Sequence, residues 1–174
     1  ITPWPGCMKR VLNKNTWNNY WDGQNNFRMF DLATLKKNTI FIHGRTDDVI
    51  NIRGHRIGSE ELESVILKLR DVYEACAVSV KDKLEGSVIF LFVVSKDKEL
   101  KYEIEKKINK NFGSFAIPKN IYFVKELPKT KSGKILRRLL RELLATSYLK
   151  SKSDKSTIAN LKLIDHLVEV IKKS

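Results

Sequence analysis

A short lysine-rich stretch in the second half of the chain carries the residue types best suited to chemistry on an anionic group. It reads PKTKSGKI from Pro128 and contains the lysines Lys129, Lys131 and Lys134. A lysine ammonium is a compact cation that binds phosphate or carboxylate oxygens and stabilises charge that develops in a transition state. Gly133 allows unusual backbone angles, and Pro128 stiffens the start of the stretch. Three roles fit these residues: a phosphate-binding loop, a nucleic-acid patch, or a loop that delivers one lysine to a reaction.

The glycine and lysine positions of this stretch do not fit a Walker A phosphate loop. That motif reads G-x-x-x-x-G-K followed by Ser or Thr. Here Pro128 stands where the first glycine belongs, and Ile135 stands where the Ser or Thr belongs. The β-rich run before the stretch is compatible with the motif, but two defining positions are wrong. A Walker A loop is therefore rejected.

The basic charge of the region allows a nucleic-acid patch without favouring one. The formal net charge is +13, which favours anionic partners but does not choose among nucleic acid, a membrane surface and a polyphosphate ligand. No aromatic residue that could stack on bases occurs within residues 129–141. A solvated basic face on an amphipathic helix is favoured over nucleic-acid binding for the cluster Lys129, Lys131, Lys134, Arg137, Arg138 and Arg141.

Runs of β-branched and aromatic residues indicate the strands that would position the stretch. The run SVIFLFVV at 87–94 is almost continuously apolar, which predicts a strand covered on both faces. Residues 1–39 are expected to be irregular, because the segment KNTWNNYWDGQNN is rich in asparagine. The other expected strands are at 39–43, 49–53, 74–80 and 120–124.

Apolar residues at helical spacing predict four helices. The first has Ser59 as its N-cap and carries an apolar face of Leu62, Val65, Ile66 and Leu69. The others are expected at 99–112, 135–144 and 161–173. With the strands, they predict a compact α+β domain in which a roughly three-stranded sheet is flanked by helices.

Several classes of protein are disfavoured by composition. No apolar run approaches the roughly 20 residues of a membrane span. The histidines His43, His55 and His166 and the two cysteines show no metal-ligand spacing, so no metal site is expected. Two cysteines without a paired motif suit a reducing compartment. The chain begins with Ile1 and lacks the apolar segment of a signal peptide, and we expect it to be a piece of a longer protein.

Two long motifs occur in the chain, GRTDDVINIRGHRIGSEELES at 44–64 and LPKTKSGKILRRLLR at 127–141, and WPG stands at 4–6. With these motifs the chain resembles the C-terminal part of AMP-forming acyl-CoA synthetases, which are adenylate-forming enzymes. Within them, it is most similar to acetyl- and propionyl-CoA synthetases. The resemblance implies that residues 1–46 are the tail of a large N-terminal domain. Residues 47–174 would be a small mobile C-terminal domain, preceded by a short β hinge.

The resemblance also implies a two-step reaction. A carboxylate attacks the α-phosphate of ATP, which gives an acyl-adenylate and pyrophosphate, and the thiol of coenzyme A then displaces AMP. The small domain rotates between the two steps. Lys134 matches the lysine required for adenylation, and it is a candidate target of a regulatory acetyltransferase and deacetylase, because acetylation removes the charge. Asp47 matches the hinge residue.

Four further residues take their expected roles from the resemblance. Asp31 and Arg45 match the residues that bind the AMP ribose, Arg56 matches an arginine near the nucleotide phosphate, and Gly54 matches a position that lines the tunnel for the coenzyme A thiol. Three residues depart from the family pattern. Phe30 replaces a glycine, Arg53 replaces a small residue, and Asn109 replaces an arginine that contacts coenzyme A in some relatives.

The expected substrates are ATP with Mg²⁺, a short-chain carboxylate and coenzyme A, with no tightly bound cofactor. The expected partner is the large N-terminal domain of the same chain; no nucleic acid or membrane partner is expected. The expected location is cytoplasmic, with mitochondrial and nuclear-cytosolic settings left open. Two alternatives remain at this point: a propionate-CoA ligase or other adenylate-forming enzyme, and a non-enzymatic module that binds polyanions through the basic helix.

Overall fold

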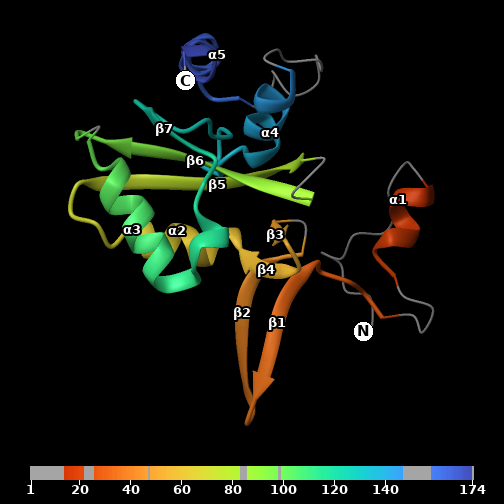
Figure 1. Ribbon diagram of the computed structural model, residues 1–174. Coiled ribbons are helices and arrows are strands. Elements are labelled where there is room, and N and C mark those ends of the chain that lie inside the picture. The colour runs from red at the N-terminus through yellow and green to blue at the C-terminus, as the bar shows by residue number, and fades with distance from the viewer. Residues whose placement is uncertain are drawn as a thin grey trace. The chain divides into compact units, whose positions relative to one another are not determined.

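The chain divides into two compact parts. The computed structural model describes residues 14–21, 26–46, 48–82, 86–97, 99–146 and 158–173 (Figure 1). Unit 1 comprises residues 1–47 and unit 2 comprises residues 48–174. This division lies next to the boundary expected between residues 46 and 47. The identity of the two units as the tail of one domain and a mobile second domain remains a prediction.

Unit 1 contains more regular structure than its asparagine-rich sequence indicates. A short helix, α1 (Lys14–Asn19), precedes an antiparallel hairpin of β1 (Asp31–Lys36) and β2 (Thr39–Arg45). The turn between the strands consists of Lys37 and Asn38, with φ angles of +49° and +54°. Positive φ at both positions matches the type I′ turn that tight hairpins favour, and asparagine tolerates it well. The expectation of irregular structure throughout residues 1–39 was therefore wrong.

The hairpin of unit 1 is exposed on both faces, whereas the rings of Tyr20, Phe27 and Phe30 pack on one another. Every residue of β1 is exposed, and Leu35, Ile40 and Ile42 keep 70%, 67% and 71% of their surface accessible. The ring of Tyr20 stacks on Phe27 at 5.8 Å and meets the edge of Phe30 at 5.4 Å. The aromatic cluster therefore holds the chain next to the start of β1.

Unit 2 has the α+β architecture that the sequence predicts. Its elements are β3 (Val49–Ile52), β4 (His55–Gly58), α2 (Ser59–Ile66), β5 (Val72–Asp82), β6 (Gly86–Ser95), α3 (Lys101–Phe112), the 3₁₀ turn η1 (Ser114–Ala116), β7 (Asn120–Val124), α4 (Arg137–Thr146) and α5 (Lys162–Lys173). The expected strand 49–53 is slightly too long, because β3 ends at Ile52 and the chain turns into β4, which the sequence analysis missed. The four expected helices are present with shifted ends.

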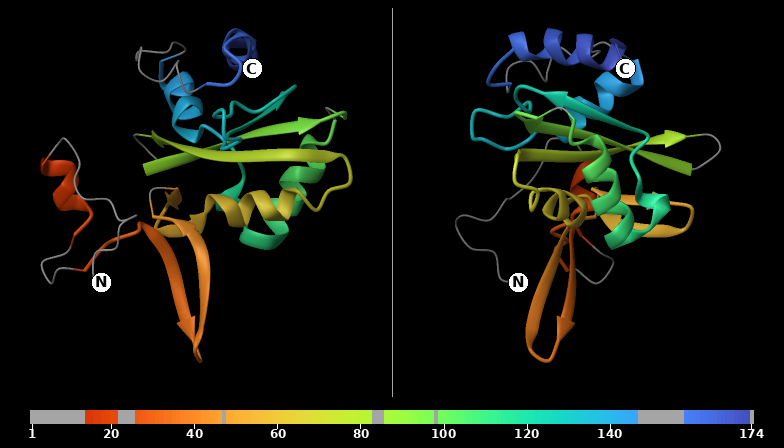
Figure 2. Two further views of the ribbon diagram at one scale, coloured as in Figure 1. Left: turned by 180° about the vertical axis from the view of Figure 1, so that it is seen from behind. Right: turned by 60° about the vertical axis from the view of Figure 1, so that its left-hand side comes forward.

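A three-stranded sheet forms the centre of unit 2. Strand β6 lies in the middle, antiparallel to β5 and parallel to β7. Helices α2 and α3 cover one face, and α4 and α5 cover the other (Figures 1 and 2). Alternate residues of β6 therefore enter two different cores: Leu91 packs with α2 and α3, and Phe92 packs with α4 and α5. The expectation of a strand covered on both faces is confirmed.

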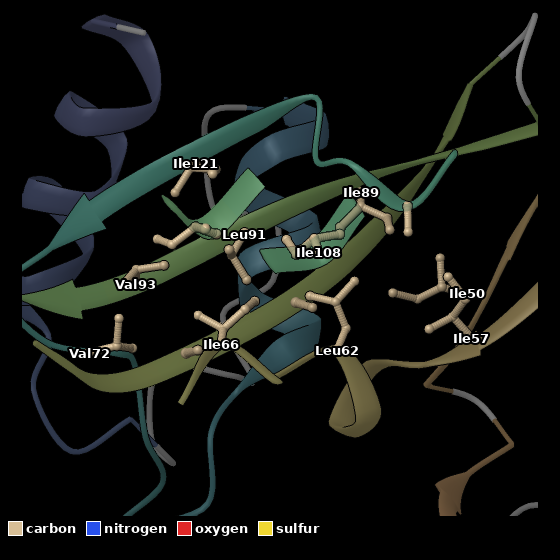
Figure 3. Close-up of a cluster of buried hydrophobic side chains, with 14 of the residues drawn as sticks. Ile50, Ile57, Leu62, Ile66, Val72, Ile89, Leu91, Val93, Ile108 and Ile121 are labelled. Carbon is tan, nitrogen blue, oxygen red and sulfur yellow. The ribbon is translucent and has the colours of Figure 1, made fainter. Parts of the chain in front are cut away.

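The first of these cores also fixes the β3–β4 hairpin. Ile50 and Ile57 lie beside Leu62 of α2 and Ile89 of the sheet in the same buried cluster (Figure 3). Ile50, Ile52 and Ile57 expose 1%, 2% and 4% of their surface. Because these three isoleucine side chains are almost completely buried, they anchor the hairpin to α2 and to the sheet. The turn at its tip is therefore held on a rigid base.

The N-terminus of α2 differs from the expectation in one detail. Gly58, with an extended backbone, is the N-cap, and no side chain caps the helix. Ser59 is the first helical residue, and its buried hydroxyl has no hydrogen-bond partner within the described residues. The N-cap role of Ser59 was therefore wrong. The helix also ends at Ile66, before Leu69, which packs against the core from outside the helix.

Among the helices in the described parts of the chain, none is long and apolar enough to span a membrane.

Candidate functional site

The lysine-rich stretch forms a small closed loop before α4. The backbone N–H of Thr130 donates to the carbonyl of Lys134 at 2.8 Å, and the N–H of Lys134 donates to Oγ1 of Thr130 at 3.1 Å. The N–H of Gly133 donates to the carbonyl of Thr130 at 2.9 Å, with φ at +86°. This positive φ explains the glycine. The side chain of Lys134 is exposed, and within the described residues no carboxylate pairs with its ammonium.

The base of this loop is fixed to the rest of unit 2. Nζ of Lys129 lies 2.8 Å from Oε1 of Glu74 on β5. The N–H of Ala159 donates to the carbonyl of Lys129 at 3.0 Å, and Ile158 forms a β-bridge with Thr130. The segment before α5 therefore pairs with the first residues of the loop. Only the tip of the loop, with Lys134 beside it, extends to solvent.

A buried ion pair lies at the start of α4. Nη2 of Arg137 lies 2.9 Å from Oε1 and 2.6 Å from Oε2 of Glu63 on α2. Oε1 of Glu63 also accepts the N–H of Ala77 on β5 at 2.8 Å. Burial raises the pKa of Glu63, while the charge of Arg137 and the Ala77 N–H act in the opposite direction. The pair joins α2, β5 and α4 at one point.

A second ion pair lies one helical turn further along α4. Nη2 of Arg141 is 2.6 Å from Oδ1 of Asp48, the first residue of unit 2. The four charges of the two pairs all act on the buried thiol of Cys76, whose pKa burial raises to about 12. The expectation of a solvated basic face on this helix was therefore partly wrong. Arg137 and Arg141 are paired internally, whereas Arg138 is exposed.

The turn between β3 and β4 presents Gly54 at the surface. Arg53 and Gly54 have φ angles of +48° and +84°, as a two-residue type I′ hairpin requires. A Cβ on Gly54 would meet no atom within 4 Å, so the structure leaves space beside it. His55 stacks on Phe115 with ring centroids 4.0 Å apart. Arg56 is exposed on β4, opposite Asn51.

An open pocket of about 360 Å³ adjoins this turn. Arg53 contributes to its lining from the turn, Phe115 from η1 and Lys119 from the segment before β7. Asp82 also lines the pocket, and its Oδ2 lies 3.6 Å from Nζ of Lys119. The pocket therefore combines cationic and aromatic groups next to Gly54. Asn109, the third departure from the family pattern, is exposed on α3.

The two residues expected to bind ribose lie opposite each other in unit 1. Asp31 pairs with Arg45 in the register of the β1–β2 hairpin, so their side chains leave the same face of the hairpin. Phe30, which replaces the family's glycine, has φ at +63°, and its carbonyl accepts the N–H of Thr46 at 2.7 Å. A left-handed backbone at this position explains why glycine suits it.

The expected site residues therefore fall into three groups. Lys134, Gly54 and Arg56 are exposed in unit 2, Asp31 and Arg45 face each other in unit 1, and the expected hinge residue Asp47 lies outside the described residues. Within the described parts of the chain, no group of three or more His, Cys, Asp and Glu side chains fits a metal ion. The sequence analysis missed the two ion pairs of α4, which no local pattern indicates.

Comparison with known proteins identifies one family. Residues 61–134 match the AMP-binding enzyme C-terminal domain. The acetyl-coenzyme A synthetase of Chlorobaculum tepidum is 36% identical over 176 aligned positions, which cover 96% of this chain and 26% of that protein. Acetyl-coenzyme A synthetase 1 of Candida glabrata is 35% identical over 187 positions, covering 98% of this chain and 26% of that protein. The chain thus spans about a quarter of the length of these relatives.

A solved structure shares the fold. ATP-bound MatB from Rhodopseudomonas palustris superposes with a TM-score of 0.68 at 23% identity, over 78% of this chain and 28% of that one. At this identity the likeness concerns the fold alone. The family match and the sequence relatives show that the chain belongs to the adenylate-forming enzymes, as a portion that contains the C-terminal domain of AMP-binding enzymes.

Proposed function

We propose that the chain is the C-terminal part of a short-chain acyl-CoA synthetase that activates acetate with ATP and transfers the acyl group to coenzyme A, releasing AMP and pyrophosphate. The observation that carries the proposal is the exposure of Lys134 on an anchored loop. The base of this loop is fixed to β5 and to the segment before α5. The loop backbone is thus already in place, so that only the side chain of Lys134 has to be ordered when its ammonium stabilises charge on a phosphate or carboxylate. The acetyl-coenzyme A synthetases among the relatives support the choice of substrates.

Each expected site residue takes one role in this proposal. Lys134 contacts the carboxylate and phosphate oxygens during adenylation. Asp31 accepts hydrogen bonds from the ribose hydroxyls, since the two oxygens of a carboxylate suit a vicinal diol. Arg45, opposite Asp31 in the hairpin, binds the same sugar.

The remaining residues act on other parts of the substrates or on the domain movement. Arg56 lies near the nucleotide phosphate, and Gly54 leaves room for the coenzyme A thiol. Asp47 is the hinge between the two conformations, which present these groups in turn.

The proposed activity requires a large N-terminal domain, since the chain spans about a quarter of its relatives. That domain would supply the acyl pocket and most of the adenine site. In the described residues nothing fits a magnesium site, so we assign the ion that accompanies ATP no step in this part of the chain. We place the enzyme in the cytoplasm and propose Lys134 as the residue that an acetyltransferase would neutralise and a deacetylase would restore.

The alternative of a polyanion-binding module is disfavoured by the ion pairs. Within the basic cluster at residues 129–141, Lys129, Arg137 and Arg141 are already paired with carboxylates of the same unit. Their charges are largely compensated, so they would contribute less to phosphate binding. A propionate-CoA ligase, or another adenylate-forming enzyme, remains the alternative within the family.

The proposal is tested by measuring acid-dependent ATP–pyrophosphate exchange and thioester formation with the full-length protein. Acetate, propionate and butyrate are compared at equal concentrations, and the 174-residue chain alone serves as the control. We expect both exchange and thioester formation in the full-length protein, each faster with acetate than with the other two acids. We expect neither reaction with the 174-residue chain alone. Preference for propionate would select the alternative ligase. Thioester formation by the chain alone, or no acid-dependent exchange in the full-length protein, would refute the proposal.

A further inference from the structure

Two arginines one turn apart on α4 face inward rather than toward solvent. Arg137 reaches Glu63 on α2, and Arg141 reaches Asp48 at the start of unit 2. The side chains of Arg141 and Asp48 keep 32% and 15% of their surface accessible, against 17% and 9% for Arg137 and Glu63. The Arg141–Asp48 pair is thus the less buried of the two. Loss of the Arg141–Asp48 pair would disturb the fold less than loss of the Arg137–Glu63 pair, because the charge left without a partner would be more accessible to water.

Helix α4 is joined closely to the loop at residues 128–136, which carries Lys134 and is called the Lys134 loop below. The helix begins at Arg137, three residues after Lys134. The N–H of Leu136 donates to the carbonyl of Pro128 at 2.8 Å, and the N–H of Leu140 donates to the carbonyl of Leu136 at 3.3 Å. The loop is therefore closed by a hydrogen bond from a residue that also joins the first turn of α4. A rotation of α4 displaces Lys134 directly.

Asp48 ties this helix to the point where unit 2 begins. It follows the proposed hinge residue Asp47 in the sequence, and its carbonyl accepts the N–H of Ser59 at 3.4 Å. The carboxylate of Asp48 meanwhile pairs with Arg141. The residue next to the hinge thus contacts both α2, through its backbone, and α4, through its side chain.

We propose that Arg141 and Asp48 are positioning residues for adenylation, which hold α4 and the Lys134 loop in a fixed orientation relative to the hinge-side end of unit 2. This inference rests on the proposed function. Nη2 of Arg141 and Oδ1 of Asp48 lie 2.6 Å apart, and a hydrogen bond in which both partners are charged is stronger than one between neutral groups. Displacement of a reacting group by about 1 Å costs roughly a hundredfold in rate. In the proposed function Lys134 acts in adenylation and not in the second half-reaction. The β3–β4 hairpin, which carries Gly54, has its own anchors in the core.

The test separates the two half-reactions in the full-length protein. Arg141→Gln is compared with Arg141→Lys and with Arg138→Gln, a change at an exposed arginine of the same helix. We expect Arg141→Gln to lower acetate-dependent ATP–pyrophosphate exchange by about tenfold or more, with thioester formation from preformed acyl-adenylate within about twofold of wild type. Arg141→Lys should recover part of the exchange rate, and Arg138→Gln should leave both reactions unchanged.

A second measurement uses the same full-length variants. Amide hydrogen exchange should become faster in residues 127–137 of Arg141→Gln, while β5 and β6 stay as protected as in wild type. Equal losses in both half-reactions, or faster exchange throughout unit 2, would mean that Arg141 only stabilises the fold, and would overturn the inference. So would an Arg141→Gln variant that behaves like Arg138→Gln. A wild-type protein without any acid-dependent exchange would instead contradict the proposed function, and the inference with it.

Discussion

Single residues in unusual backbone conformations lie at or next to three of the proposed site residues. Gly133 and Gly54 lie at positive φ in the Lys134 loop and in the β3–β4 turn, and Phe30 lies at positive φ before Asp31. For the two glycines, the sequence already contained the signal, because glycine adopts this conformation without strain. At Phe30 the sequence contained no such signal, because a non-glycine residue rarely adopts positive φ, and an aromatic contact with Tyr20 accompanies this conformation.

Gly54→Ala tests the role of the open space beside that residue. A matched control is Gly86→Ala, since both glycines have positive φ and a Cβ added to either would meet no atom within 4 Å. Each variant should lose about 1 kcal/mol of unfolding free energy from backbone strain, measured by urea denaturation of the chain. In the full-length protein only Gly54→Ala should lose thioester formation. If the two variants remain equally active, Gly54 does not line the path of the thiol.

At the scale of elements, strong local patterns predicted strands and helices but not the contacts between them. Strand β7 has the expected bounds, because NIYFV is rich in β-branched and aromatic residues. The strand expected at 39–43 is present as β2, but its partner β1 was missed, because the turn between them is Lys-Asn rather than a glycine pair. The pair Glu63–Arg137 spans 74 positions. Such a contact depends on packing, so the sequence pattern of α2 and α4 could not reveal it.

Removal of the Glu63 charge should strongly destabilise unit 2. Glu63→Gln leaves the partly buried guanidinium of Arg137 without its counter-charge, which we expect to cost about 2–3 kcal/mol. Glu60→Gln, on the exposed side of the same helix, should change stability by less than about 0.5 kcal/mol. Thermal and urea unfolding of both variants measure the difference. Equal stabilities would show that the pair does not hold α2 and α4 together.

Burial of Cys76 should make the stability of the chain fall in alkali. In the unfolded chain this thiol ionises near its ordinary pKa of 9.0, whereas the folded state keeps the proton up to about pH 12. Between these values the folded state binds more protons than the unfolded state, so unfolding becomes easier as pH rises, by up to about 1.4 kcal/mol per pH unit. Urea denaturation at several pH values, compared between Cys76→Ala and its parent in a Cys7→Ser background, isolates this contribution. Identical pH slopes would contradict it.

At the scale of the whole molecule, the division into two units places the proposed ribose residues and the proposed adenylation lysine on different parts. Asp31 and Arg45 belong to unit 1, and Lys134 and Gly54 belong to unit 2, with the boundary at residues 47 and 48. The sequence predicts a domain boundary between residues 46 and 47 only through resemblance to a family, and the identity of the two units as separate domains stays a prediction. The proposed reaction needs the two units to change their arrangement between the half-reactions.

The central claim is that the loop delivers Lys134 to the adenylation step. Lys134→Ala in the full-length protein, beside Lys131→Ala in the same loop, tests it most directly, because both lysines are exposed and only one is expected to contact substrate. We predict that Lys134→Ala lowers acetate-dependent ATP–pyrophosphate exchange by about a hundredfold or more, with thioester formation from preformed acyl-adenylate retained and Lys131→Ala active in both. Undiminished exchange in Lys134→Ala, or equal losses in the two variants, would contradict the account.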